Sequence, residues 1–130
     1  MPEHPNVTRV RAGYEAFGKG DFAALDELFA EDISWHLPGR NQLSGVYEGR
    51  AAVYEMFARL MQITEGTFRA DVRTVLADDD HAVVVADVSA RRGENSFSVT
   101  DAHVLRFAGE RVAEFWETTG DQYAVDAVFG

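Results

Sequence analysis

The chain contains no cysteine, which excludes a disulfide framework and thiolate chemistry. Basic residues are few: 12 Lys and Arg stand against 22 Asp and Glu, and the formal net charge is −10. A chain of this charge repels phosphate backbones and anionic membrane surfaces, so we expect no nucleic-acid partner and no membrane partner. No apolar run approaches the ~18 residues of a membrane helix, and the first ten residues lack the pattern of a signal peptide. We therefore expect a cytoplasmic protein.

The length and composition are those of one globular domain. Of the 130 residues, 46% are hydrophobic and 26% are charged, which is close to the average of soluble globular proteins. A chain of this length can form a packed core with room for one cavity. No linker or repeat interrupts it, so we predict a single domain over residues 1–130.

Apolar residues recur every three or four positions in three segments, which is the period of a helix with one buried face. The segments are 7–17, 22–29 after an N-cap at Asp21, and about 50–64. An alternating segment, 33–37, ends at Pro38-Gly39 and predicts a short strand. A polar loop follows over 40–49.

The second half of the chain alternates apolar and polar residues, which predicts strands over 67–77, 81–91, 96–107 and 111–119. The turns between them are short and force antiparallel neighbours. The predicted fold class is α+β: three N-terminal helices cover one face of a curved, mostly antiparallel sheet, with strand 33–37 at one edge. Asp78-Asp79-Asp80 lacks the ligand spacing of a metal loop and is interpreted as a hairpin turn.

Strand 96–107 places two polar residues among apolar ones. Asp101 and His103 alternate onto the face that carries Phe97, Leu105 and Phe107. If the next turn centres on Gly109, Asp101 faces Glu117 and His103 faces Phe115. Two carboxylates on an apolar face cannot both ionise cheaply, so one pKa should rise and the imidazole should stay charged or share the proton. The group is an acid/base centre if it contacts a ligand and a structural network if it only fills the core, and the residues leave both readings open.

The sequence carries no motif for a bound metal or cofactor. The four histidines show no spacing that would set two imidazoles on one ion, and a glycine-rich phosphate loop is absent. We predict neither a cofactor nor a metal.

Several segments, in their order, resemble the SnoaL-like branch of the NTF2-like superfamily, which includes ketosteroid isomerases and polyketide cyclases. They are the helix with Tyr14 followed by GKGDFAALDELFAEDISW, WHLPG at 35–39, SGVYEG at 44–49, HVLRF at 103–107, and ERVAEFWE ahead of Asp121. The resemblance implies a cone of curved sheet closed by helices around an internal apolar pocket, commonly in a dimer. Because such a pocket is the unfilled centre of the core, seven residues are expected to be core or substrate contacts: Tyr14, Trp35, Leu37, Phe57, Leu60, Met61 and Phe115. His36 alternates away from this side unless Pro38 introduces a bulge.

The resemblance also shows which chemistry is missing. Ketosteroid isomerases use an Asp base and an oxyanion hole made of Tyr and a protonated Asp. Tyr14 matches the Tyr, but Leu37 and His103 stand at the positions of the two Asp residues. The Arg-x-Asp unit of limonene epoxide hydrolases is absent too, because Val99 stands two residues before Asp101.

The closing strand keeps one element of the SnoaL-type cyclases, an acid/base carboxylate directly after a Trp. Glu117 is the matching residue and is longer by one methylene, whereas Phe115 replaces the family's histidine. We predict a cofactor-independent enzyme of isomerase, cyclase or related lyase type, in which Asp101, His103 and Glu117 act on a small apolar carbonyl compound. The alternative is a non-catalytic domain that holds a small ligand or acts as a scaffold. A homodimer is expected through the outer sheet face that bears Val104, Arg106 and Trp116.

Overall fold

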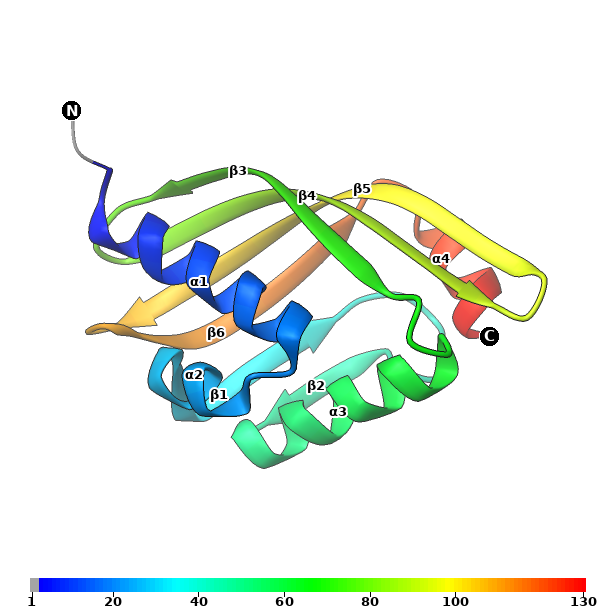
Figure 1. The fold of residues 1–130 in the computed structure, drawn as a ribbon, viewed down its shortest axis with the longest axis horizontal. Helices are drawn as coiled ribbons and strands as arrows, with labels where there is room; N and C mark the ends of the chain where they lie inside the picture. Colours follow the sequence, from blue (N-terminus) through cyan, green and yellow to red (C-terminus); the bar gives the residue numbers. More distant parts are fainter. Residues whose placement is uncertain (1–2) are drawn as a thin grey trace.

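The computed structural model describes residues 3–130 and contains four helices and six strands within them. In chain order the elements are α1 (Pro5–Lys19), α2 (Phe22–Leu28), β1 (Phe29–Leu37), β2 (Gly45–Glu48), α3 (Arg50–Ile63), β3 (Arg69–Ala77), β4 (His81–Arg92), β5 (Asn95–Ala108), β6 (Arg111–Thr119) and α4 (Gln122–Phe129). Figure 1 shows that the strands form one twisted sheet along which α1 lies.

Local sequence sets the ends of the first two helices. Pro5 occupies the first turn of α1, where its missing N–H costs nothing, and Gly20 ends the helix at φ 67°, a left-handed conformation that suits glycine. The Asp21 side chain accepts a hydrogen bond from the Ala24 amide, so the predicted N-cap of α2 is confirmed. The predicted second helix was one residue too long, because Phe29 has extended backbone and already begins β1.

The sheet has the strand order β2-β1-β6-β5-β4-β3. Strands β3 to β6 form the predicted antiparallel meander. The prediction that β1 lies at an edge is wrong, because β1 runs parallel to β6 on one side and pairs with β2 on the other. Strand β2 lies within the segment predicted to be a polar loop; its single short ladder to β1 stabilises four residues that have no apolar alternation.

A fourth helix, α4, follows the last strand, where no helix was predicted. Asp121 caps it by accepting from the Ala124 amide, and Val125, Val128 and Phe129 are its buried residues. Asp126 ties α4 to the loop after β1: its carboxylate accepts from the Arg40 backbone amide at 3.1 Å and from the Asn41 side chain at 2.7 Å. The helix therefore covers one end of the sheet.

The register of the β5–β6 hairpin differs from the predicted one. His103 faces Glu117, Leu105 faces Phe115, and Asp101 faces Thr119. The turn is Gly109-Glu110 rather than Gly109 alone, and a bulge between Arg106 and Phe107 adds one more residue of offset. The two offsets move the partner by two positions, so each side chain keeps the predicted face.

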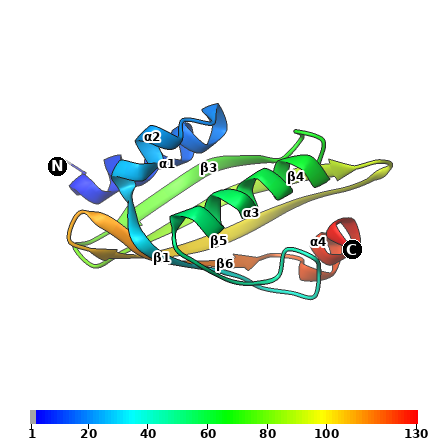
Figure 2. The same cartoon turned by 90° about the horizontal axis from the view of Figure 1, so that it is seen from below.

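Helices α1, α2 and α3 lie together on one side of the sheet, and the opposite side is open (Figure 2). The core fills the space between the helices and the sheet; its fully buried residues include Val10, Leu25, Ile33, Val53 and Val84. Among the described residues, no helix is both long and apolar enough to cross a membrane.

Candidate functional site

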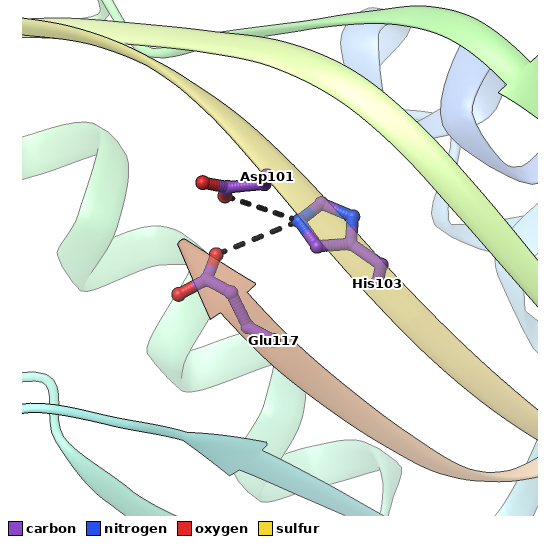
Figure 3. A group of neighbouring side chains, drawn as sticks. All are labelled: Asp101, His103 and Glu117. Carbon is purple, nitrogen blue, oxygen red and sulfur yellow. Dashed lines mark hydrogen bonds and ion pairs between the residues drawn. The ribbon is translucent and has the colours of Figure 1, made fainter. Parts of the chain in front are cut away.

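Three ionisable side chains meet on the helix-covered face of the sheet (Figure 3). Asp101 and His103 come from β5, and Glu117 comes from the neighbouring position of β6. His103 Nε2 lies 3.2 Å from Asp101 Oδ2 and 3.6 Å from Glu117 Oε1. Carboxylates only accept hydrogen bonds, so a hydrogen on Nε2 satisfies both contacts. The three side chains meet, but the prediction that they share one cavity with Trp35, Phe57 and Phe115 is wrong, because Glu117 lines a different cavity from those residues.

The other nitrogen of the same imidazole contacts α1. His103 Nδ1 is hydrogen-bonded to the Tyr14 hydroxyl, and the two rings lie nearly parallel with their centroids 5.8 Å apart. Phe115 packs against the third side of the imidazole at a centroid distance of 5.0 Å. The ring is therefore held by α1, β5 and β6 together, and its two nitrogens contact groups of different chemistry.

Burial and charge act in opposite directions on this histidine. Burial alone lowers the pKa of His103, but the hydrogen bonds and charges of Asp101 and Glu117 outweigh it, so the pKa is raised. The side chain of His103 is 6% exposed and that of Asp101 only 2%, so little water screens them. An imidazolium paired with the Asp101 carboxylate is the state that these surroundings favour.

Burial also raises the pKa of two neighbouring groups, Glu117 and Tyr14. Burial raises the pKa of Glu117, the charge of Asp101 adds to this, and His103 opposes it. Burial and the charges of Glu117 and Asp101 raise the pKa of Tyr14, which keeps its hydroxyl protonated. A carboxyl whose pKa moves toward neutrality is better matched to accept and return a proton.

Asp101 Oδ1 is the buried side-chain oxygen without a hydrogen-bond partner among the described residues. The ligand atoms of Asp101, His103 and Glu117 all lie within 4.8 Å of one another, and one imidazole with two carboxylates is a donor set that can hold a divalent ion. The same three side chains can instead share a proton. His103 Nε2 and Asp101 Oδ2 lie 3.2 Å apart, which is within hydrogen-bond distance.

Two cavities flank this group of three residues. The first, here called the apolar cavity, has a volume of about 70 Å³ and lies under α1 and α2. Its lining residues are apolar except for the Tyr14 hydroxyl and the indole N–H of Trp35, and Trp35 stacks on Phe115 in its wall with the ring centroids 3.7 Å apart. The Tyr14 hydroxyl and the Trp35 indole N–H are therefore the polar side-chain groups of the residues that line this cavity.

The second, here called the Glu117 cavity, has a volume of about 40 Å³. Glu117 lines it together with Asn41, the end of β1, the end of α3 and α4. The Glu117 side chain keeps 21% of its surface exposed, in contrast to its two buried partners. The Tyr14–His103–Glu117 contacts thus run from one cavity to the other.

Six of the seven predicted pocket residues line one of these two cavities. Tyr14, Trp35, Phe57 and Phe115 line the apolar cavity, and Leu37 and Leu60 line the Glu117 cavity. Met61 lines neither and is 37% exposed, because it lies one position past Leu60 on α3 and so points off the buried face. His36 lies on the outer sheet face, where it stacks on Trp116 and contacts Glu114 at 3.3 Å, so no bulge turns it inward.

Some lining residues were not found from the sequence. Phe68 borders both cavities, and Val125 and Phe129 of α4 close the Glu117 cavity. The α4 residues had a usable signal, since Asp121 and the three-and-four spacing of Val125, Val128 and Phe129 predict a capped helix. For Phe68 no local signal exists, because the cavities form only when distant segments assemble.

The sequence of residues 10–115 matches the family model of the SnoaL-like domain. An uncharacterised protein of Mycobacterium tuberculosis is 27% identical over 128 residues, which cover 98% of each chain. Bal32a, from a soil-derived mobile gene cassette, has a solved structure that superposes with a TM-score of 0.92 at 38% identity, over 96% of each chain.

A more distant likeness concerns the fold alone. A candidate SnoaL-like polyketide cyclase of Jannaschia sp. superposes with a TM-score of 0.79 at 18% identity. The match covers 99% of this chain and 96% of the other. The whole arrangement of helices and sheet is therefore shared, while the side chains of the site must be judged in this chain itself.

Proposed function

Because this chain belongs to the family of SnoaL-like domains, we propose that it is an acid/base enzyme of isomerase, cyclase or related lyase type. Its substrate is a small apolar carbonyl compound, and the reaction is removal of a proton next to the carbonyl and its return at another atom. The observation that carries the proposal is the buried imidazole of His103, held between a tyrosine hydroxyl and two carboxylates beside two cavities.

Each residue has a role that its surroundings support. Glu117 is the proton acceptor, because it is the carboxylate that lines a cavity and its pKa is raised by burial. Asp101 is completely enclosed and keeps His103 charged and oriented. When both imidazole nitrogens carry hydrogen, Nδ1 donates to the Tyr14 oxygen, and the Tyr14 hydroxyl is free to donate to a carbonyl oxygen.

The reaction needs both the Tyr14 hydroxyl and the Glu117 carboxylate. Abstraction of the proton leaves negative charge on the carbonyl oxygen, and a positioned hydroxyl that is already polarised by an imidazolium stabilises that charge. Proton transfer by a positioned carboxylate typically contributes ~10²–10⁴ in rate. The bonds balance within one molecule: a C–H bond breaks, the proton resides on Glu117, and a new C–H or O–H bond forms when the proton returns.

A second candidate function is a non-catalytic domain that holds a small apolar ligand. Leu37 and His103 stand at the two positions where the isomerases have Asp. The side chains that line the apolar cavity and would contact a ligand are mostly hydrocarbon. In that case His103, Asp101 and Glu117 only fill the core, and the protein catalyses no proton transfer.

Exchange of hydrogen with solvent distinguishes the two functions without knowledge of the natural substrate. Acetophenone and cyclohexanone, incubated with the protein in D₂O, should gain deuterium next to the carbonyl, measured by proton NMR. The Glu117→Gln variant should lose this exchange by at least roughly 10²-fold. Glu55→Gln, which removes the same charge from an exposed position of α3, is the matched control and should exchange like the wild type. Equal rates for wild type and Glu117→Gln would favour the ligand-holding function.

We also propose that two copies associate through the open face of the sheet. The register places one apolar-rich row across all six strands: Leu76, Val83, Val104, Trp116, His36 and Val46. Leu76 and Val46 are 65% and 55% exposed, which is unusual for large apolar side chains in such a row. Arg106 lies 2.9 Å from Glu114 beside the row, so the face carries locally balanced charge in a chain whose net charge is −10. This balance of charge lowers the repulsion between two copies at this face.

A further inference from the structure

We propose that the Phe68 side chain is a movable partition between the apolar cavity and the Glu117 cavity, and that it determines the length of the molecule that the site accepts. The inference rests on the proposed function, which requires one ligand to contact both Tyr14 and Glu117. Phe68 is then a specificity-determining residue outside the group of three acid/base residues.

The position of Phe68 is the first observation. Among the residues that the structure describes, it alone lines both cavities. Tyr14 lies on the one side and Glu117 on the other, so the two polar groups that must act on one molecule border different spaces. Their connection through His103 passes beside the cavities and gives a ligand no passage.

The sizes of the cavities are the second observation. Their volumes are about 70 Å³ and about 40 Å³. A hydrocarbon-lined cavity that holds one benzene ring measures roughly 150 Å³. Neither cavity alone receives an aromatic ketone. When the Phe68 ring turns aside, the two cavities join into one elongated pocket. A ligand in that pocket puts its apolar body under α1 and its carbonyl near the acid/base residues.

In this proposal the Phe68 side chain rotates while its backbone stays in place. The preceding residue is fixed: Thr67 Oγ1 donates to Thr64 O at 2.6 Å and accepts from the Arg91 amide at 2.8 Å. These bonds fasten the backbone to the end of α3 and to β4. The Phe68 ring itself is half-buried and meets Phe17 edge-on, with the centroids 5.9 Å apart. Rotation of the side chain therefore opens the partition while the backbone stays in place.

Affinity for a short and a long ketone tests this inference. Acetophenone has one ring and 4-acetylbiphenyl has two; their dissociation constants can be measured by quenching of the Trp35 fluorescence, with Trp116→Phe as a common background. Phe68→Ala should bind 4-acetylbiphenyl at least roughly tenfold more tightly than the parent protein does, because the ligand no longer has to turn a ring aside. The affinity for acetophenone should also rise, but by a smaller factor, because the shorter ketone fills less of the joined pocket.

Phe17→Ala is the matched control, because Phe17 lines only the apolar cavity and its removal leaves the partition intact. It should show no comparable gain for 4-acetylbiphenyl. Thermal melting verifies that each variant is folded, and Phe68→Leu replaces Phe68→Ala if the latter is not. A gain for Phe68→Ala no larger than that of Phe17→Ala, or no binding of 4-acetylbiphenyl by any of the proteins, overturns the inference. Because the readout is affinity, loss of the proposed catalysis would leave this result unchanged and is detected separately by deuterium exchange.

Discussion

The two carboxylates beside His103 should respond in opposite ways to loss of their charge. Asp101 is 2% exposed and lies 3.2 Å from His103 Nε2, whereas Glu117 is 21% exposed and lies 3.6 Å away. We expect Asp101→Asn to destabilise the protein by about 3 kcal/mol, because it leaves a buried imidazolium without its nearest carboxylate. Glu117→Gln should leave the free energy of unfolding unchanged or raise it by on the order of 1 kcal/mol.

The sign for Glu117 follows from its raised pKa. A carboxyl whose folded pKa lies above its unfolded value of 4.5 is favourable while protonated, and this contribution is lost as the pH rises through the folded pKa. Each unit of upward shift costs about 1.4 kcal/mol once the group is ionised. Gln carries no such cost. The advantage of Glu117→Gln should therefore be present at pH 7 and absent at pH 4.

Urea denaturation followed by circular dichroism at pH 7 and pH 4 measures both effects. For a chain of this length, 1 kcal/mol corresponds to about 4 °C in melting temperature, so Asp101→Asn should melt on the order of 10 °C lower. A loss of stability in Glu117→Gln as large as that in Asp101→Asn would refute this reasoning. It would identify Glu117 as an equal structural partner of the imidazolium and weaken its assignment as the proton acceptor.

Three further outcomes follow from the same contacts. Tyr14→Phe removes the hydroxyl that contacts His103 Nδ1; deuterium exchange should fall, and unfolding by urea should show a loss of about 1–2 kcal/mol because a buried nitrogen loses its partner. Since the three acid/base residues share a proton, EDTA should leave the exchange rate unchanged, and elemental analysis should find no stoichiometric metal; loss of exchange on chelation contradicts this assignment. Light scattering at micromolar concentration should give about twice the chain mass of 14.4 kDa, and Trp116→Glu should give the chain mass itself; a monomeric wild type rules the dimer out.

Local patterns predicted most of the fold. The meander from β3 to β6 was readable because each strand alternates and each turn is short, and Asp21 correctly marked the start of α2. The errors lie where pairing with a distant segment decides the structure. Strand β2 exists only through its ladder to β1, and the parallel neighbour of β1 is β6, about 80 positions later in the chain.

The candidate site was predicted in composition but not in register. The faces of Asp101, His103 and Glu117 follow from alternation alone, and a shift by two positions preserves them. The position of Glu117 opposite His103 depends on the two-residue turn and on the bulge beside Phe107, which no residue type in the hairpin predicts. The separation of the pocket into two cavities depends on Phe68, which lies just before β3, and the Glu117 cavity is closed by α4, which follows β6.

Nitrogen NMR of the His103 ring tests the central claim most directly. The account predicts an imidazolium at pH 7, with hydrogen on both ring nitrogens and a pKa above the ordinary value of 6.5, and it predicts that Asp101→Asn lowers this pKa. Because the folded pKa is raised, the contribution of His103 to stability should be complete below pH 6.5 and be lost as the pH rises through the folded pKa. A neutral imidazole at pH 7 that does not respond to Asp101→Asn would contradict the proposed proton-handling site.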